Sequence, residues 1–595
     1  MHCKDVLLKT HRLVNPLMMA ILLLLIFTGP AGGETIKLNI EGLKGEEFKN
    51  VQATLELPIG IIKEDLINWR WLGHYQKQIP EQVSKALEPF GYFHSRSEVE
   101  LKEKSEGDYL LAVRVNKGRP VVLTKVDIAI EGTAKKNRQV ARAVRDFPLK
   151  IGDILRQDYY TQGKHAIRNA AVNQGFLKAG FSRHEIRIFP EKNQAEIELH
   201  LASGQQYSFG EVTFNGAEKY PRDFLLRYVD FKPGNIYLSP KWDRTRANFQ
   251  NANRFSDVVL IAKIEEADEN SRVPIEINLT ALPSKRWRNG IGYGDSTGPR
   301  LLSNYQDVNI FGAGHEFNTD ITLGEKYQLV ELRYTIPEYT HVKNAHVLST
   351  GIEREENDIY QSTSGFVEWE KMFFLGSGKV GSFYTRYAQE SFEISDQENT
   401  SRLLLPGIRY IQRSYNDPVN PRKGYQFRLE LRGAEEHLLS DVSLLQGLAA
   451  GNTFWPLFEK FSLFLRLEAG YTIKNDAIAE IPTSLRFFVG GDNSVRGYAY
   501  NSEGPRDENG EVVGGEALLV GSLEVEREMG ERWGLAAFYD IGSAFNPGND
   551  TRFIQGAGAG IRIYTPVGPL KMDIARQIGE DDPSYRFHLS IGFDL

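Results

Sequence analysis

Cysteine is almost absent from this sequence of 595 residues, which contains only Cys3. That residue precedes an apolar run near the N-terminus, whereas a cysteine for lipid attachment would follow such a run. We expect Cys3 to be removed with an export signal, which leaves a mature chain without thiols. Disulfides and zinc–thiolate sites are then excluded, so burial and backbone pairing must stabilise the fold.

An excess of basic residues is absent as well. The chain has 71 Lys and Arg residues against 78 Asp and Glu residues, which gives a formal net charge of −7. Proteins that bind nucleic acid usually carry a clustered positive charge. We therefore expect no nucleic-acid partner.

The sequence also lacks an apolar run that would cross a membrane as a helix. The run from Leu17 to Phe27 falls short of the roughly 20 residues that span a bilayer. Basic residues precede it and small residues follow it, as in a secretory signal (Lys4, Lys9 and Arg12; Ala31, Gly32 and Gly33). We expect residues 1–33 to be a signal peptide cleaved after Gly33, and an uncleaved anchor is the alternative.

Signatures of catalysis and cofactor binding are missing. Gly376–Val380 superficially resembles a phosphate-binding loop, but valine stands where the pattern requires serine or threonine, and the upstream glycine is absent. The sequence has no His-Glu-x-x-His segment, and no serine and histidine form a pattern suggestive of a lipid hydrolase. We expect no enzymatic activity, no cofactor and no metal site.

The first half of the chain contains one pattern three times, in residues 34–118, 119–204 and 205–282. Each copy begins with a short alternating strand that ends in glycine, at Gly42, Gly132 and Gly216. Helical patterns and two further alternating runs follow, so the predicted order is strand, helix, helix, strand, strand. A glycine suited to a left-handed helix end follows the second helix in two copies, whereas the third has Arg254 in that place.

This order resembles the polypeptide-transport-associated (POTRA) domain, present here three times. The resemblance implies a periplasmic arm that handles client chains by adding a strand to an exposed sheet edge. Three inert α+β spacers are the alternative.

From about residue 284 to the end, the helical pattern gives way to alternation with a period of two. From Tyr585 to Leu595, for example, the odd positions are apolar and the even ones are polar or small. About sixteen such segments lie between Trp287 and Leu595. Because hydrocarbon does not tolerate an unpaired sheet edge, residues 283–595 are predicted to form a closed transmembrane β-barrel. The expected fold is thus α+β repeats followed by an all-β barrel of about sixteen antiparallel strands.

The same alternation predicts which side chains face the lumen of the barrel. In the last third of the chain the inward positions include several acids (Glu524, Glu526, Asp540 and Asp573). Three glycines, Gly556, Gly558 and Gly560, also face inward and leave space beside the wall. An ordinary solvated lining is the alternative interpretation of the acids.

One stretch stands out in the longest loop-like segment of this half, from Leu485 to Tyr498. Gly490 and Gly491 allow the backbone to turn where other residues would clash. Arg496 is framed by Val495, Gly497 and Tyr498. Loop arginines are mostly exposed, so a solvated turn with an incidental charge is the plain alternative.

This loop resembles the signature loop of the BamA superfamily of outer-membrane assembly and secretion barrels. Three further stretches carry the resemblance: Asp417–Tyr425, Phe538–Gly542 and Gly558–Asp573. It implies that the loop folds back into the lumen and that Arg496 pairs with Asp540 and with Glu524. Removing one partner of a buried charge pair is costly, so we interpret the pair as a positioning lock.

The superfamily resemblance also implies a lateral gate between the first and last strands. The first strand contains Gly290, Gly292 and Gly294, and the last contains Gly592 followed by Phe593. Glycine weakens a strand, so this seam should open more easily than the rest of the barrel. Glycines that merely relieve crowding are the alternative.

The three repeats, together with the stretches 485–500 and 565–575, most resemble the TamA branch of this superfamily. The resemblance implies insertion of clients such as autotransporters into the bacterial outer membrane, with the repeats in the periplasm. The implied partners are a TamB-like protein anchored in the inner membrane, unfolded outer-membrane clients and outer-membrane lipid. The alternative function is a two-partner-secretion transporter that exports a client through the lumen.

Overall fold

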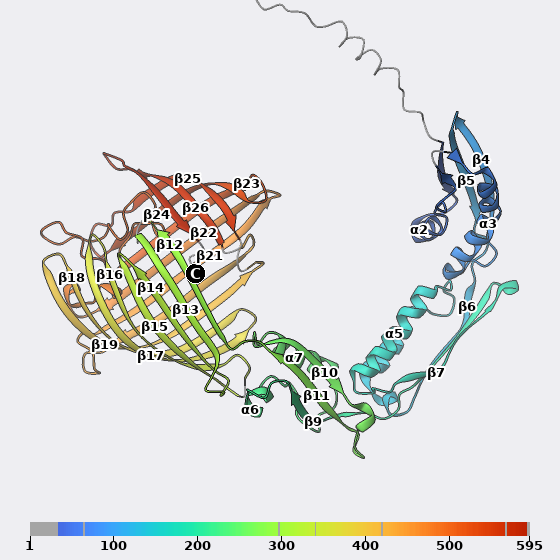
Figure 1. Cartoon of the computed structure of the whole chain (residues 1–595), viewed down its shortest axis with the longest axis horizontal. Coiled ribbons are helices and arrows are strands. Elements are labelled where there is room, and N and C mark those ends of the chain that lie inside the picture. Colours follow the sequence, from blue (N-terminus) through green and yellow to red (C-terminus); the bar gives the residue numbers. More distant parts are fainter. Residues whose placement is uncertain are drawn as a thin grey trace, which may run out of the picture. The chain divides into compact units, whose positions relative to one another are not determined.

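The computed structural model of the chain (Figure 1) describes residues 34–63, 66–294, 298–339, 341–417, 420–565 and 568–591. The predicted signal peptide, residues 1–33, and the seam residues Gly592 and Phe593 lie outside the described residues. No helix in the described ranges is long and apolar enough to cross a membrane.

The N-terminal part contains three α+β units that share one order of elements. The first consists of β1 (Thr35–Glu41), α2 (Gly45–Thr54), the hairpin β2 (Ile62–Lys63) and β3 (Leu66–Ile67), α3 (Trp69–Leu87), β4 (Arg96–Ser105) and β5 (Asp108–Asn116). The second consists of β6 (Val122–Glu131), α4 (Arg138–Arg145), α5 (Gln157–Asn173), β7 (Gly180–Phe189) and β8 (Gln194–Ala202). The third consists of β9 (Ser208–Asn215), α6 (Arg222–Leu226), α7 (Ser239–Gln250), β10 (Phe255–Ala262) and β11 (Arg272–Ala281). In each unit the last strand of the sequence lies in the middle of a three-stranded sheet, between the first strand of the unit and the strand that immediately precedes it, in the orders β1-β5-β4, β6-β8-β7 and β9-β11-β10.

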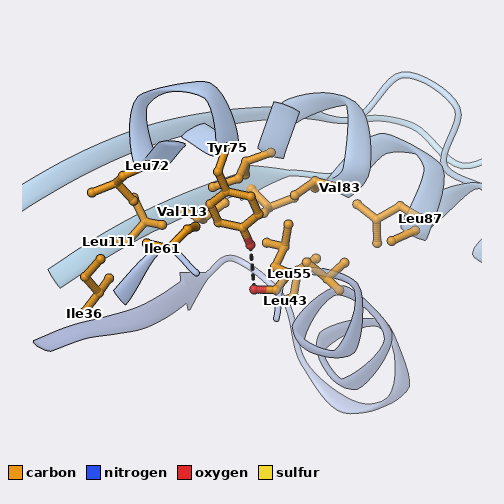
Figure 2. Close-up of a cluster of buried hydrophobic side chains, with 14 of the residues drawn as sticks. Ile36, Leu43, Leu55, Ile61, Leu72, Tyr75, Val83, Leu87, Leu111 and Val113 are labelled. Atoms are coloured by element: carbon orange, nitrogen blue, oxygen red, sulfur yellow. Dashed lines mark hydrogen bonds between the residues drawn. The ribbon is translucent and has the colours of Figure 1, made fainter. Parts of the chain in front are cut away.

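The first unit shows how these sequences form the predicted elements. Helix α3 buries Leu72, Tyr75, Ile79 and Val83, spaced three or four residues apart, so that one face packs on the sheet. Figure 2 shows this core, in which the Tyr75 hydroxyl donates a 2.7 Å hydrogen bond to the carbonyl of Leu55. The helix extends ten residues further toward the N-terminus than the pattern at 79–87 indicates.

The glycines predicted at the helix ends have the expected backbone conformation. Gly91 and Gly175 both have φ +88°, in the left-handed region that favours glycine. In the third copy Asn253, which precedes Arg254, has φ +54°. Asparagine tolerates this region better than other side chains. In the third unit the left-handed residue is therefore Asn253, one position before the place that glycine occupies in the other two units.

The rest of the chain forms one antiparallel sheet of sixteen strands, in sequence order from β12 to β27 (Figure 1), which confirms the predicted fold class. The strands are β12 (Lys285–Gly294), β13 (Gly298–Ile310), β14 (His315–Gly324), β15 (Tyr327–Pro337), β16 (Ala345–Glu356), β17 (Tyr360–Gly376), β18 (Lys379–Ile394), β19 (Gln397–Tyr415), β20 (Gly424–Ala434), β21 (Leu444–Phe458), β22 (Phe461–Lys474), β23 (Ala517–Glu528), β24 (Trp533–Phe545), β25 (Ile554–Thr565), β26 (Gly568–Ile578) and β27 (Tyr585–Ile591). The outer face is apolar, as at Leu519, Leu523 and Tyr539, whereas Ser522, Glu524 and Asp540 are buried.

Residues 212–231 of the third α+β unit contact one end of the barrel, with which they form one compact unit. The side chain of Asn309, beside the turn between β13 and β14, donates a 3.0 Å hydrogen bond to the carbonyl of Lys219. Arg227 donates a 2.6 Å bond to the carbonyl of Val342, in the turn between β15 and β16. Turns alternate between the two ends of an antiparallel barrel, so the connection between β22 and β23 starts at the opposite end.

Candidate functional site

The connection between β22 and β23, residues 475–516, folds into the barrel; we call it the lumen loop. Its side chains Phe487, Val489, Val495 and Tyr498 form a buried apolar cluster with inward-facing residues of the wall (Leu518, Val520, Ala544 and Ile554). Val495 is fully buried. The solvated-turn interpretation of this stretch is therefore wrong.

Arg496 lies at the centre of a buried charge cluster and is only 6% exposed. Its Nε and Nη2 donate to the two carboxylate oxygens of Asp540 at 2.7 and 2.9 Å. Its Nη1 donates to Glu524 at 2.9 Å and to Asp573 at 3.0 Å. The guanidinium carbon also lies 3.3 Å from the ring centre of Phe538. The structure thus brings together the three residues that the sequence paired, and it adds Asp573.

A second arginine in the cluster, Arg562, was not assigned a role from the sequence. It donates to Glu524 at 2.8 Å and to Asp573 at 2.6 Å, and it is 1% exposed. We call Arg496, Arg562, Glu524, Asp540 and Asp573 the lock cluster. Two guanidinium groups face three carboxylates here, and Ser522 donates a further 2.6 Å bond to Asp540. Each carboxylate therefore has an ionic partner, as burial of charge requires.

Glycines make the space in which Arg496 fits. A Cβ atom on Gly556 would overlap the carbonyl oxygen of Arg496, and one on Gly560 would overlap the carboxylate of Asp573. A Cβ on Gly558 would lie 2.5 Å from the ring of Phe538. Gly556 therefore lets the loop backbone approach the wall directly, and Gly558 and Gly560 leave room for the Phe538 ring and the Asp573 carboxylate that contact Arg496.

Two turns in the loop also need glycine. Gly490 has φ +113° and Gly497 has φ +102°, and Gly491 has φ +97°. A Cβ on Gly490 would overlap the carbonyl oxygen of Ala499. The Gly-Gly pair thus folds the tip back on itself, and Gly497 lets the chain leave the lock cluster.

The two residues after Arg496 fix the tip to the last two strands and to the turn between them. The Gly497 amide donates a 3.0 Å hydrogen bond to Nε2 of His588 on β27. Its carbonyl accepts a 3.2 Å bond from the side chain of Gln577 on β26. The Tyr498 hydroxyl donates to Glu580 at 2.9 Å.

A second anchor holds the base of the loop on the other side of the barrel. Glu390 on β18 is 4% exposed and accepts hydrogen bonds from the Thr483 hydroxyl at 2.7 Å, from the Ser484 hydroxyl and from the Ser484 amide. Gln446 on β21 donates a 2.8 Å bond to the carbonyl of Leu485. The sequence analysis missed this anchor, because no pattern links Glu390 to residues more than 90 positions away.

Replacing Glu390 with alanine is expected to loosen the base of the loop while leaving the lock cluster intact. Three donors of the loop and the Ser362 hydroxyl would lose a charged acceptor, and hydrogen bonds to charged groups contribute about 1.5–3 kcal/mol each in favourable cases. We expect faster hydrogen exchange in residues 478–488 and a smaller change in 494–498, measured on the full-length protein. The control is Glu393→Ala, a change to the next acid on the same strand, which should leave both segments unchanged. Equal acceleration in both segments would contradict two separate anchors.

The seam between the first and last strands differs from the other strand pairs. Strands β12 and β27 contact each other, but the described residues show no hydrogen-bonded ladder between them, whereas every consecutive pair from β12 to β27 has one. Gly290, Gly292 and Gly294 lie on β12, which pairs with β13 from Lys285 to Gly294. Within the described residues, the last strand pairs with β26 from Tyr585 to Ile591.

The fold and the loop together define a class: POTRA-bearing barrels with a buried arginine in a loop that occupies the lumen. Residues 309–595 match the family model of the Omp85 superfamily domain. Residues 37–117 match a model described as POTRA domain TamA domain 1, and residues 207–281 match a POTRA model described as surface antigen variable number repeat. The chain therefore has POTRA domains followed by a sixteen-stranded β-barrel, and most of the barrel is similar to the Omp85 superfamily domain.

Two assembly factors and one solved structure are similar to this chain. The outer membrane protein assembly factor BamA of Nitratidesulfovibrio vulgaris is 21% identical over 93% of this chain and 72% of its own length. BamA of Neisseria meningitidis serogroup B is 21% identical over 70% of this chain and 60% of its own length. The crystal structure of Haemophilus ducreyi BamA lacking POTRA domains 1–3 covers 79% of this chain and 99% of that chain, with a TM-score of 0.68 at 16% identity. The protein is located in the bacterial outer membrane, with its POTRA domains in the periplasm.

Proposed function

We propose that this protein inserts client β-barrel proteins into the outer membrane through the seam between β12 and β27. The observation that carries the proposal is a sixteen-stranded sheet whose first and last strands touch without a ladder among the described residues. A strand edge with unpaired amides and carbonyls can template the pairing of another strand. The glycines of β12 reduce side-chain bulk at that edge. The similar assembly factors support the same function.

The lumen loop argues against export through the barrel as the main activity. It contacts β18 through Glu390 and the opposite sector of the wall through the lock cluster. A chain that crosses the lumen would have to displace buried ion pairs, which cost several kcal/mol to break. Secretion of the two-partner type remains the second candidate. Single-channel conductance separates the two, because a large and stable pore favours export.

Within the superfamily, we propose a TamA-type role with autotransporters among the clients. The match of residues 37–117 to the TamA domain 1 model supports this assignment. It implies a TamB-like partner anchored in the inner membrane, and outer-membrane lipid as the surrounding medium. Co-purification of such a partner from membranes of the native host tests the assignment. We further propose that the protein works without catalysis or a cofactor, which a phospholipase assay on the purified barrel tests.

A disulfide across the seam is expected to abolish client insertion. Cysteines are introduced alone and in pairs along β12 and β27, starting with Ile291 and Leu589, and the pair that cross-links on oxidation is used; the only natural cysteine of the chain is Cys3. The oxidised double variant should lose insertion into vesicles, and reduction should restore it. The control is a pair on a complete ladder, Leu301→Cys with Leu323→Cys, which lie opposite each other on β13 and β14. Full insertion by the oxidised seam variant would refute the gate.

A further inference from the structure

His588 connects the last strand of the barrel to the tip of the lumen loop. It lies on β27 and is 3% exposed. Its Nε2 accepts the Gly497 amide at 3.0 Å, and its Nδ1 lies in hydrogen-bond contact with the carboxylate of Asp492. Asp492 and Gly497 lie on either side of Arg496 in the sequence. One imidazole therefore holds the tip at two points.

The donors and acceptors define one tautomer for this histidine. A backbone amide can only donate, so Nε2 carries the lone pair and Nδ1 carries the proton. The proton on Nδ1 then points at the Asp492 carboxylate, which orients the ring. In this state both ring nitrogens are used, and β27 is tied to the loop through a neutral side chain.

Because His588 lies on the last strand of the sheet, its contacts with the loop depend on the position of that strand. Strand β27 has a ladder with β26 on one side and the seam on the other. His588 lies directly opposite Asp573 in that ladder, and Asp573 belongs to the lock cluster. Movement of β27 away from β26 or out of the wall would pull His588 away from Gly497 and Asp492.

We propose that His588 is a positioning residue that couples the lumen loop to the gate. While the lock cluster holds the loop, the two contacts of His588 hold β27 in its closed position. Opening of the seam then requires those contacts to break, and a client strand that displaces the loop tip releases β27. This inference rests on the proposed gate function, and it adds the residue through which the loop controls that gate.

The test uses the full-length protein in lipid nanodiscs without a client. Spin labels at Ile291 and Leu589 report the width of the seam, and hydrogen exchange reports the loop tip and β27. His588→Ala should broaden the distance distribution and speed exchange in residues 490–498 by at least tenfold, because two hydrogen bonds are lost, one of them to a charged group. His588→Gln should restore much of the wild-type behaviour, because its amide oxygen can accept the Gly497 amide.

Two further variants keep the result interpretable. Ser590→Ala changes the next residue on β27 that lines the lumen cavity of about 310 Å³ beside His588, and it should behave like the wild type. Asp492→Asn removes the charged acceptor without a change in side-chain size, and it should broaden the distance distribution across the seam less than His588→Ala does. It replaces His588→Ala as the test if the alanine variant does not fold. An unchanged seam in both His588→Ala and Asp492→Asn overturns the coupling.

Client insertion distinguishes this coupling from the gate itself. If the oxidised seam disulfide stops insertion but His588→Ala leaves the seam unchanged, the gate stands and the coupling is wrong. If His588→Ala widens the seam but the disulfide does not affect insertion, the coupling stands and the proposed function is wrong.

Discussion

Replacing Arg496 with alanine is expected to lower the free energy of unfolding of the barrel by about 3–5 kcal/mol, the usual cost of removing one partner from a buried ion pair. The substitution leaves Asp540 without its ionic partner, while Glu524 and Asp573 keep only Arg562. Two buried carboxylates would then share one guanidinium group, and the third would have none. Urea unfolding of the protein in lipid vesicles, followed by gel mobility of the folded and unfolded forms, measures the change.

The effect should be specific to the lock cluster. Asp540→Ala should cost a similar amount, and the double variant should cost clearly less than the sum, because the two residues share one interaction. Arg506→Ala provides a control on the same loop: its side chain is half exposed and pairs with Glu503 at 3.5 Å, so it should change stability by less than about 0.5 kcal/mol. Fully additive losses for Arg496 and Asp540 would show that they act independently.

The alternation of the strands is sufficient to predict one side of the lock cluster. Successive side chains of a strand point to opposite faces, so the apolar outer positions of β23, β24 and β26 place Glu524, Asp540 and Asp573 inside. The same rule continues from Gly556, Gly558 and Gly560 to Arg562, which means that the signal for the second arginine was present in the sequence. Alternation does not show which inward side chains lie close to the loop. The pairing of Arg496 with Asp540 was predicted from the family resemblance.

The second anchor shows where prediction from the sequence ends. Glu390 lies at an inward position of β18, but many inward residues in the barrel are charged. Its partners Thr483 and Ser484 come from a loop whose path is set by the closed wall around it. The position of the loop base thus depends on tertiary packing, and a period of two carries no information about it. The seam could be predicted only in part. The glycines of β12 are visible in the sequence, whereas the missing ladder between β12 and β27 depends on how the sheet closes.

Gly556→Ala is expected to destabilise the locked loop nearly as much as the loss of Arg496, although every charge remains in place. The new Cβ would overlap the carbonyl oxygen of Arg496. The strand backbone cannot yield, because β25 pairs with β24 and β26 on both sides, so the loop backbone must move. Overpacking of this kind costs about 1–3 kcal/mol, and displacement of Arg496 from its carboxylates adds to it. The same urea titration gives the total, and protease sensitivity of residues 490–498 shows whether the loop has left the wall.

The matched control for this variant is Gly521→Ala on β23. A Cβ there would lie 3.5 Å from the Leu467 side chain, an ordinary van der Waals distance, so the substitution should be nearly neutral. Combining Gly556→Ala with Arg496→Ala separates the two causes. If the glycine acts by making room for the arginine and its peptide, the second substitution should add little to the first. Full additivity, or a stable Gly556→Ala variant with a protected loop, would mean that the empty space beside β25 does not hold the loop in place.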